Sequence, residues 1–176
     1  MRAVVVYESM YGNTHLVADA IGSGLADGFD VSVLPVSQAD PAALEEADLV
    51  VVGGPTHAHG MSRQSTRHGA ATAAKKDDSD LTLEPDAIGP GLRDWFDSLA
   101  KGQHHASAAA FDTRMSGPSA FTGRASKGVS RALRRHGFDL VAEPESFLVT
   151  KDNHLAPAED ERAKTWGARL AAVTAG

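Results

Sequence analysis

Residues 8–14 bring together the groups that proteins use to hold a phosphate. Ser9 and Thr14 supply hydroxyls, Asn13 supplies an amide, and the helix expected behind them adds unpaired backbone N–H groups. Gly12 allows the backbone to approach an anion closely. Because this loop holds no Lys or Arg, it would bind a phosphate through dipoles and hydrogen bonds. The alternative interpretation is an ordinary turn that caps a helix.

A second pair of residues that could do chemistry is His57 and His59. Two histidines separated by one residue can ligate a metal, but no third ligand follows them nearby. The alternative is a loop with two solvated imidazoles. We therefore expect no metal at this pair.

The composition argues against several classes of function. The chain of 176 residues has no cysteine, which excludes disulfides, thiolate metal sites and cysteine nucleophiles. Its formal net charge of −6 argues against a general nucleic-acid surface. No apolar run approaches the ~20 residues of a membrane span, so we expect a cytoplasmic protein. The first loop also lacks the spaced glycines of a dinucleotide fingerprint and the Gly-Lys-Ser/Thr of a P-loop.

The elements that must position these loops follow from hydrophobic patterning. Short apolar runs predict strands at residues 3–7, 29–36, 49–52, 106–111 and 139–149. Helical spacing of apolar residues predicts helices between and after them. We expect Gly53-Gly54-Pro55 to end the third strand, Pro144 to kink the fifth, and the polar residues at about 62–84 to form an insertion without a period. The βα order predicts one α/β domain over residues 1–176, whose ligand site lies at the carboxyl ends of parallel strands.

The motif Ser9-Met10-Tyr11-Gly12-Asn13-Thr14 resembles the phosphate loop of flavodoxins, Thr/Ser-x-Thr/Ser-Gly-Asn-Thr, and it follows the first strand as in that family. Tyr11 departs from the usual small hydroxyl residue, and Ser-Met-Tyr-Gly is instead similar to flavodoxin-like NAD(P)H:quinone oxidoreductases. Residues 54–61 resemble the second loop of those enzymes, Pro-Thr-x4-Met. The resemblance implies a flavodoxin-like, doubly wound sheet of five parallel strands in the order 2-1-3-4-5.

FMN is the cofactor that this resemblance implies. Ser9, Asn13 and Thr14 would hold its 5′-phosphate together with the loop N–H groups. The second loop would pass beside the flavin ring, with one imidazole on or next to it, and the third loop would close the other edge. The implied site residues are Ser9, Met10, Tyr11, Gly12, Asn13, Thr14, Pro55, Thr56, His57, Ala58, His59, Gly60, Asp112, Thr113, Arg114, Ser116 and Gly117.

The expected function is that of an FMN-binding redox flavoprotein. Our main hypothesis is an oxidoreductase that takes electrons or hydride from NAD(P)H and passes them to a quinone-like acceptor. The alternatives are a one-electron shuttle between protein partners and a flavodoxin fold without FMN that acts as a binding module. The expected partner is a redox protein or a small-molecule acceptor, not nucleic acid. The sequence is compatible with both a monomer and a homo-oligomer. Basic residues within 124–135 form either a solvated helix face or a dock for an acidic partner or a nucleotide phosphate.

Overall fold

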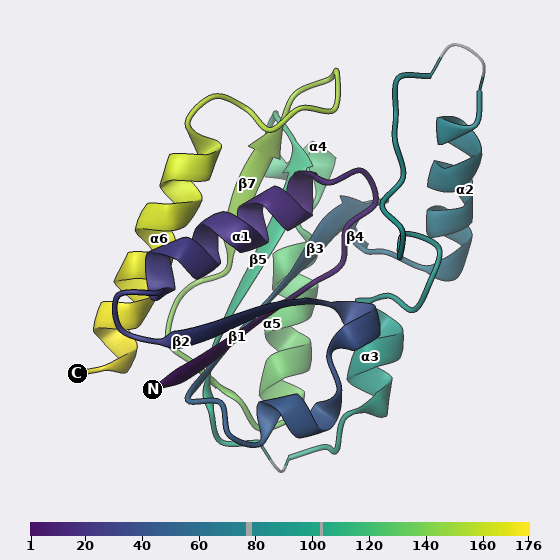
Figure 1. Cartoon of the computed structure of the whole chain (residues 1–176). Coiled ribbons are helices and arrows are strands. Elements are labelled where there is room, and N and C mark those ends of the chain that lie inside the picture. Colours follow the sequence, from purple (N-terminus) through teal and green to yellow (C-terminus); the bar gives the residue numbers. More distant parts are fainter. Residues whose placement is uncertain (77–78, 103) are drawn as a thin grey trace.

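A parallel sheet forms the centre of the computed structural model, which describes residues 1–76, 79–102 and 104–176 (Figure 1). Its strands pair in the order β2-β1-β3-β5-β6, and β7 also pairs with β5. The strands are β1 (Arg2–Tyr7), β2 (Asp30–Pro35), β3 (Leu49–His57), β5 (Ser107–Met115), β6 (Asp139–Leu140) and β7 (Glu145–Val149). This arrangement confirms the predicted α/β class and the predicted order of the parallel strands.

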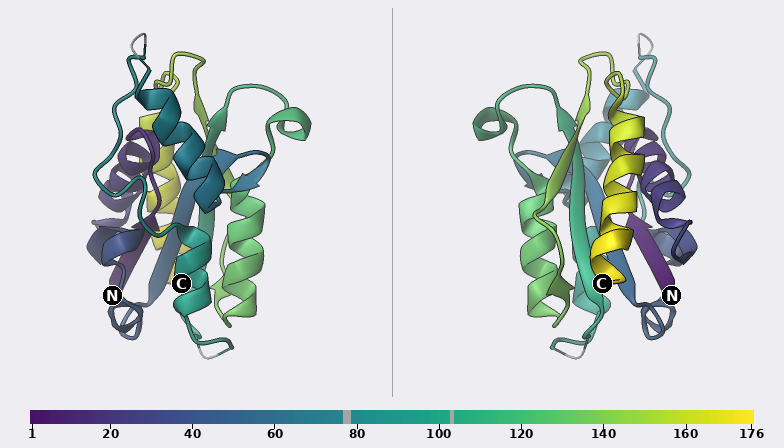
Figure 2. Two further views of the ribbon diagram at one scale, coloured as in Figure 1. Left: turned by 90° about the vertical axis from the view of Figure 1, so that its right-hand side faces the viewer. Right: turned by 90° about the vertical axis from the view of Figure 1, so that its left-hand side faces the viewer.

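Helices cover both faces of the sheet (Figure 2). One face is covered by α1 (Asn13–Leu25) and α6 (Glu159–Thr174), and the other by α3 (Leu92–Ser98) and α5 (Ala125–Arg135). Successive residues of the buried strands point to opposite faces, so Val5 packs under α1 while Val4 and Val6 pack on the α3 side. Short 3₁₀ turns, η1 (Val36–Gln38) and η2 (Pro41–Leu44), follow β2.

Two glycines bring α1 and α6 into close backbone contact. A Cβ at Gly24 would lie 2.0 Å from the carbonyl oxygen of Lys164, and a Cβ at Gly167 would lie 2.3 Å from that of Ile21. Any side chain at either position must therefore push the helices apart. The close contact fixes α1, whose N-terminus carries the first loop.

The expectation that Gly53-Gly54-Pro55 ends the third strand is wrong, because β3 continues to His57. The two glycines serve packing instead. A Cβ at Gly53 would lie 2.3 Å from the Phe111 ring, and one at Gly54 would lie 2.7 Å from Leu92. The extended β3 then turns back into β4 (Gly60–Met61), which pairs with it in antiparallel fashion.

The polar residues at about 62–84, predicted as an insertion without a hydrophobic period, contain the helix α2 (Gln64–Ala74). Residues 77 and 78 of this segment lie outside the described part of the chain. In Figure 1, α2 stands beside the carboxyl ends of the strands and apart from the two helical layers. Its buried residues are Arg67 and Ala71, so its inward face lacks the apolar stripe that predicts a helix.

The fifth strand divides at Pro144 into β6 and β7, as the proline predicts. Side chains bond to the backbone of this region. The guanidinium of Arg162 donates to the Ser146 carbonyl at 2.5 Å, and the Glu159 carboxylate accepts from the Leu148 N–H at 2.8 Å. Arg124 donates to the Pro144 carbonyl. None of the helices in the described residues is both long enough and apolar enough to cross a bilayer.

Candidate functional site

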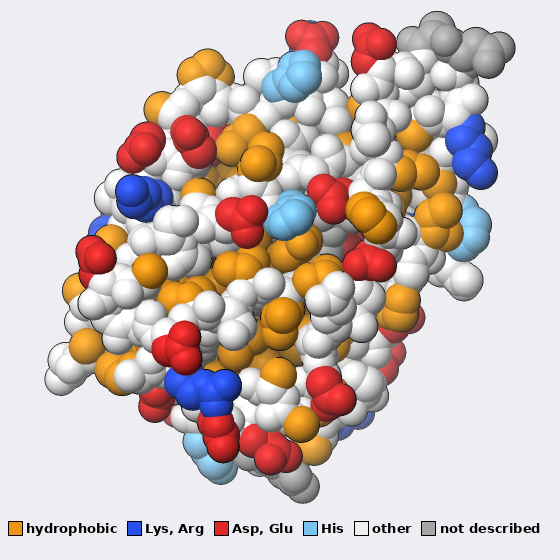
Figure 3. Space-filling view, viewed as in Figure 1, with side chains coloured by type: hydrophobic (Ala, Val, Ile, Leu, Met, Phe, Trp, Pro, Cys, Tyr) orange, Lys and Arg blue, Asp and Glu red, His pale blue; other side chains and the backbone are white. Residues whose placement is uncertain are grey.

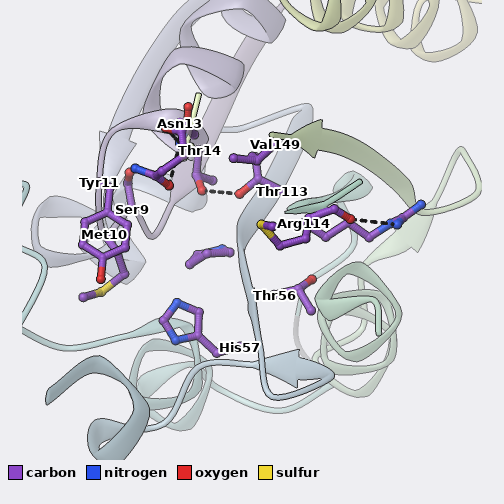
Figure 4. Close-up of a pocket in the computed structure, with 13 residues that line it drawn as sticks. Ser9, Met10, Tyr11, Asn13, Thr14, Thr56, His57, Thr113, Arg114 and Val149 are labelled. Carbon is purple, nitrogen blue, oxygen red and sulfur yellow. Dashed lines mark hydrogen bonds between the residues drawn. The ribbon is translucent and has the colours of Figure 1, made fainter. Parts of the chain in front are cut away.

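A cavity opens at the carboxyl ends of β1, β3, β5 and β7, where a doubly wound sheet binds its ligands (Figure 4). The first loop, the end of β3 and the end of β5 surround it. Its lining residues are Ser9, Met10, Tyr11, Asn13, Thr14, Pro55, Thr56, His57, Thr113, Arg114, Met115, Val149 and Asn153. The cavity has a volume of about 140 Å³.

The first loop turns sharply into α1 at Gly12, whose φ of 94° only glycine adopts without strain. The Gly12 N–H donates to the Ser9 hydroxyl oxygen at 3.1 Å, which folds the loop into a small ring. Asn13 and Thr14 are the first residues of α1, so their N–H groups have no acceptor within the helix. The helix start is therefore turned toward the cavity with free donors and the positive end of its dipole.

Two side-chain contacts tie this helix start to neighbouring strand ends. The Oγ1 atoms of Thr14 and Thr113 lie 2.7 Å apart and share a hydrogen bond in a buried position. The Asn13 amide donates to the Asn153 carbonyl at 2.9 Å and lies 3.1 Å from its side-chain oxygen. The predicted phosphate loop is thus joined to β5 and to the segment after β7.

The second loop is a tight hairpin rather than an open turn. Its two central residues, Ala58 and His59, have φ values of 44° and 72°, the signature of a two-residue turn that normally contains Asn-Gly. Left-handed backbone costs such residues about 1–2 kcal/mol each. A bridge between His59 and Gly123 braces the hairpin, and a Cβ at Gly123 would lie 2.2 Å from His59 Cα.

The third loop was predicted to contribute Asp112 to the ring edge, and the structure instead buries this residue completely. Its Oδ2 accepts from the Ser126 N–H at 2.7 Å, so the carboxylate caps the start of α5. Thr56 caps the same helix, since its hydroxyl accepts from the Ala125 N–H at 2.9 Å. Asp112 and Thr56 therefore fix α5 to the ends of β5 and β3.

A charged cluster with two buried members, Arg67 and Glu8, lies near His57. The Arg67 guanidinium donates to Ser62 Oγ at 3.0 Å and to Asp94 Oδ2 at 2.9 Å, and the Glu8 carboxylate accepts from the Leu92 N–H at 2.8 Å. Burial lowers the pKa of the His57 imidazole; the Glu8 carboxylate opposes this shift and the Arg67 cation reinforces it. His57 is therefore a neutral ring at pH 7, directed at the cavity in Figure 4.

The insertion contacts the first loop at Met10 and Tyr11. The Tyr11 hydroxyl donates to the Ala70 carbonyl of α2 at 2.8 Å, and the Glu84 N–H donates to the Met10 carbonyl at 2.9 Å. Burial raises the pKa of the Tyr11 phenol. The tyrosine that distinguishes this loop from the flavodoxin pattern thus holds the insertion.

The cavity unites most of the residues predicted for the site. The predicted residues that do not line it are Gly12, Ala58, His59, Gly60, Asp112, Ser116 and Gly117. Met115, which also lines the cavity, lies within the third loop (residues 112–117) but was not among the implied contacts. Sequence reasoning missed Val149 and Asn153, although the loop after the fifth strand ends at the same edge of the sheet and was a signal that could have found them. Within the described residues, no group of three His, Asp or Glu side chains could hold a metal ion.

The hydrogen-bond donors of the first loop fit a phosphate, and the rest of the cavity wall fits a flavin ring. The free N–H groups at the start of α1 and the hydroxyls of Ser9 and Thr14 form an uncharged cradle. Arg114 adds no charge to this cradle, because its guanidinium turns away from Thr14 and donates to the Gly117 carbonyl at 2.8 Å (Figure 4). The remaining wall, with Pro55, His57 and Met115, is mixed in polarity.

Comparisons with known proteins agree with this geometry. No curated protein matches the chain. A flavodoxin from the domain Archaea shares its fold, with a TM-score of 0.67 and 20% identity over 100% of both chains. The Streptococcus pneumoniae TIGR4 flavodoxin gives a TM-score of 0.66 at 22% identity, covering 98% of this chain and 99% of its own. A WrbA-like flavodoxin protein from Agrobacterium tumefaciens gives 0.61 at 21% identity, covering 99% and 97%. The family model described as flavodoxin matches residues 5–166, and the chain therefore belongs to the flavodoxin family.

Proposed function

We propose that the chain binds FMN at this cavity and serves in electron transfer. The observation that carries the proposal is the start of α1, where Gly12 turns free N–H groups and the Thr14 hydroxyl toward one cavity at four strand ends. Ser9, Asn13 and Thr14 would hold the 5′-phosphate, and the neutral His57 imidazole would lie against the ring. The flavin supplies the redox chemistry, while the chain supplies position and electrostatics.

The size of the cavity favours a partly exposed ring. Its volume of about 140 Å³ lies below the range of about 300–1,000 Å³ that is usual for pockets that enclose a ligand. A flavin ring that extends out of the cavity is accessible to a second protein. This accessibility supports the transfer of single electrons between proteins.

A reductase that uses NAD(P)H and a quinone-like acceptor is the second candidate. It is favoured by the second loop, where the hairpin offers His57 and no Tyr or Trp to cover the ring. An uncovered ring face suits stacking of a nicotinamide or a quinone.

Flavin absorption of the purified protein, followed by anaerobic mixing with NADH or NADPH, separates these functions. FMN binding without bleaching by either nucleotide supports the shuttle, and rapid bleaching supports the reductase. A chain that binds neither FMN nor riboflavin would contradict both and leave the binding module.

A further inference from the structure

The charges of this chain are strongly segregated. Residues 113–138 contain no Asp or Glu but carry the basic residues Arg114, Arg124, Lys127, Arg131, Arg134 and Arg135. The rest of the chain is left with 11 Lys and Arg against 23 Asp and Glu, a net charge of −12. Figure 3 shows acidic side chains outnumbering basic ones over the face that carries α1 and β2. An overall acidic protein thus has one basic region.

The basic side chains of α5 are available to a partner. The helix buries Val129 and Leu133 against the sheet and exposes Lys127, Arg131 and Arg134. In the described part of the chain, none of the basic residues of 113–138 forms an ion pair with a carboxylate. Their charge is therefore not neutralised within the molecule.

These side chains line a groove of about 310 Å³. One wall is the basic side of α5, and the other is the chain at Glu143 and Pro144. Arg124 spans the groove, because its Nε donates to Ser146 Oγ at 3.0 Å while its backbone precedes α5. The Arg124 guanidinium is thereby fixed at the end of the groove, where its charge adds to that of Lys127, Arg131 and Arg134 against the single carboxylate of Glu143.

An apolar contact point lies on the same stretch of chain. Phe121, on the short helix α4 (Ser119–Thr122), is 77% exposed, and Met115 at the end of β5 is 44% exposed. Arg114 braces this arm through hydrogen bonds to the Gly117 carbonyl at 2.8 Å and to Thr122 Oγ1 at 3.0 Å. Exposed aromatic and Met side chains beside charged residues are typical of protein interfaces.

This region also borders the candidate site. Thr113, Arg114 and Met115 line the cavity, and α5 begins at the hydrogen bonds from Ala125 to Thr56 and from Ser126 to Asp112. We propose that residues 114–135, here called the basic docking surface, bind an acidic redox protein, with Phe121 and Met115 at the contact nearest the cavity. This inference rests on the proposed function, because it supplies the partner for a bound FMN.

The test compares two charge-matched variants of the FMN-loaded protein. Lys127→Gln combined with Arg131→Gln neutralises the groove, and Lys164→Gln combined with Arg169→Gln removes the same charge from the exposed side of α6. The probe is a reduced plant-type [2Fe–2S] ferredoxin, which is small and acidic. Reduction of the FMN is followed by stopped flow between about 10 mM and about 300 mM salt.

We expect the rate with the native protein to fall as salt rises, because attraction between opposite charges is screened. The groove variant should be slower by about tenfold at low salt, and the α6 variant should stay within about twofold. Phe121→Ser should slow the reaction at all salt concentrations. Calorimetric titration of the oxidised proteins with ferredoxin should show the same order of affinities.

Equal rates for the two charge variants would overturn the proposal, as would a rate with ferredoxin that rises with salt. The reduced flavoprotein can also be mixed with oxidised cytochrome c, a basic protein that would accept the electron. A reduction of this cytochrome that is faster at low salt than at high salt, and equal in the two charge variants, would place docking on the acidic remainder instead. If the groove variant binds a DNA duplex more weakly than the native protein does, while its binding to ferredoxin is unchanged, the groove would be assigned to nucleic acid. Failure of the proposed function is distinct from these results, because it is seen as absent flavin absorption before any partner is added.

Discussion

The hydroxyls of Thr14 and Thr113 meet at 2.7 Å between the start of α1 and the end of β5. Both side chains are buried, and both residues line the cavity. A single hydrogen bond thus joins the predicted phosphate loop to the predicted third loop. The two threonines share this bond, but only Thr14 stands at a helix N-terminus.

The first prediction separates these roles. Thr14→Val should weaken FMN binding about tenfold or more, because a hydrogen bond to a charged phosphate contributes about 1.5–3 kcal/mol. Riboflavin, which has no phosphate, should bind almost as before. Fluorescence titration with both ligands measures the difference. Thr113→Val breaks the same bond between the threonines and shows how much affinity depends on that bond. Equal losses for FMN and riboflavin in the Thr14 variant would show that Thr14 does not contact the phosphate.

The second prediction concerns the attachment of α2. Arg67 is 3% exposed and donates to Ser62 and Asp94, and charge-assisted hydrogen bonds of this kind contribute about 1.5–3 kcal/mol. Arg67→Met should increase the rate of proteolytic cleavage within residues 62–84 by about tenfold or more. Lys75→Met removes the same charge at an exposed position and should change the rate little. Comparable cleavage of both variants would mean that Arg67 does not hold the insertion.

The third prediction follows from the lowered pKa of buried His57. Between that lowered pKa and the ordinary value of about 6.5, the unfolded chain binds more protons than the folded chain. The free energy of unfolding should therefore decrease as the pH falls below about 6.5. Burial also lowers the pKa of His104, which adds to the same trend. His57→Phe should flatten the dependence in part, measured by urea unfolding at about pH 7.5 and about pH 5.5. An unchanged slope would remove His57 as a source of the effect.

The fourth prediction tests the contact between α1 and α6. Gly24→Ala should lower the free energy of unfolding by about 1–3 kcal/mol, because its Cβ would meet the Lys164 carbonyl at 2.0 Å. Gly28→Ala is the matched control, since the nearest atom to its Cβ is Ala171 Cβ at 3.9 Å. Thermal or urea unfolding compares the two. Equal stability of both variants would show that the helices separate at little cost.

Most of this fold could be predicted from the sequence, because the buried strands consist of short apolar runs. Gly53 and Gly54 misled the prediction, because the same residues that end strands also allow a ring or a helix to pack closely. The helix α2 was missed since its buried face contains Arg67, and only tertiary contacts with Ser62 and Asp94 make that burial favourable.

The candidate site was predictable where a local motif describes it. The first loop combines its turn, cap and donors within six residues, and five of these residues line the cavity. That they bind FMN stays a prediction. Asp112 was misplaced because its role as a cap for Ser126 depends on a contact between β5 and α5. Asn153 was missed because its partner Asn13 is 140 residues away.

The divided fifth strand has a consequence for the behaviour of the protein at high concentration. A long free strand at the border of a sheet invites a second chain to extend it, which begins domain swapping and fibril growth. Here the break at Pro144 leaves only short ladders, and side chains already occupy backbone groups that an incoming strand would need. Arg124 and Arg162 take the carbonyls of Pro144 and Ser146, and Glu159 takes the N–H of Leu148. The chain thereby carries its own protection against self-templated aggregation at this border.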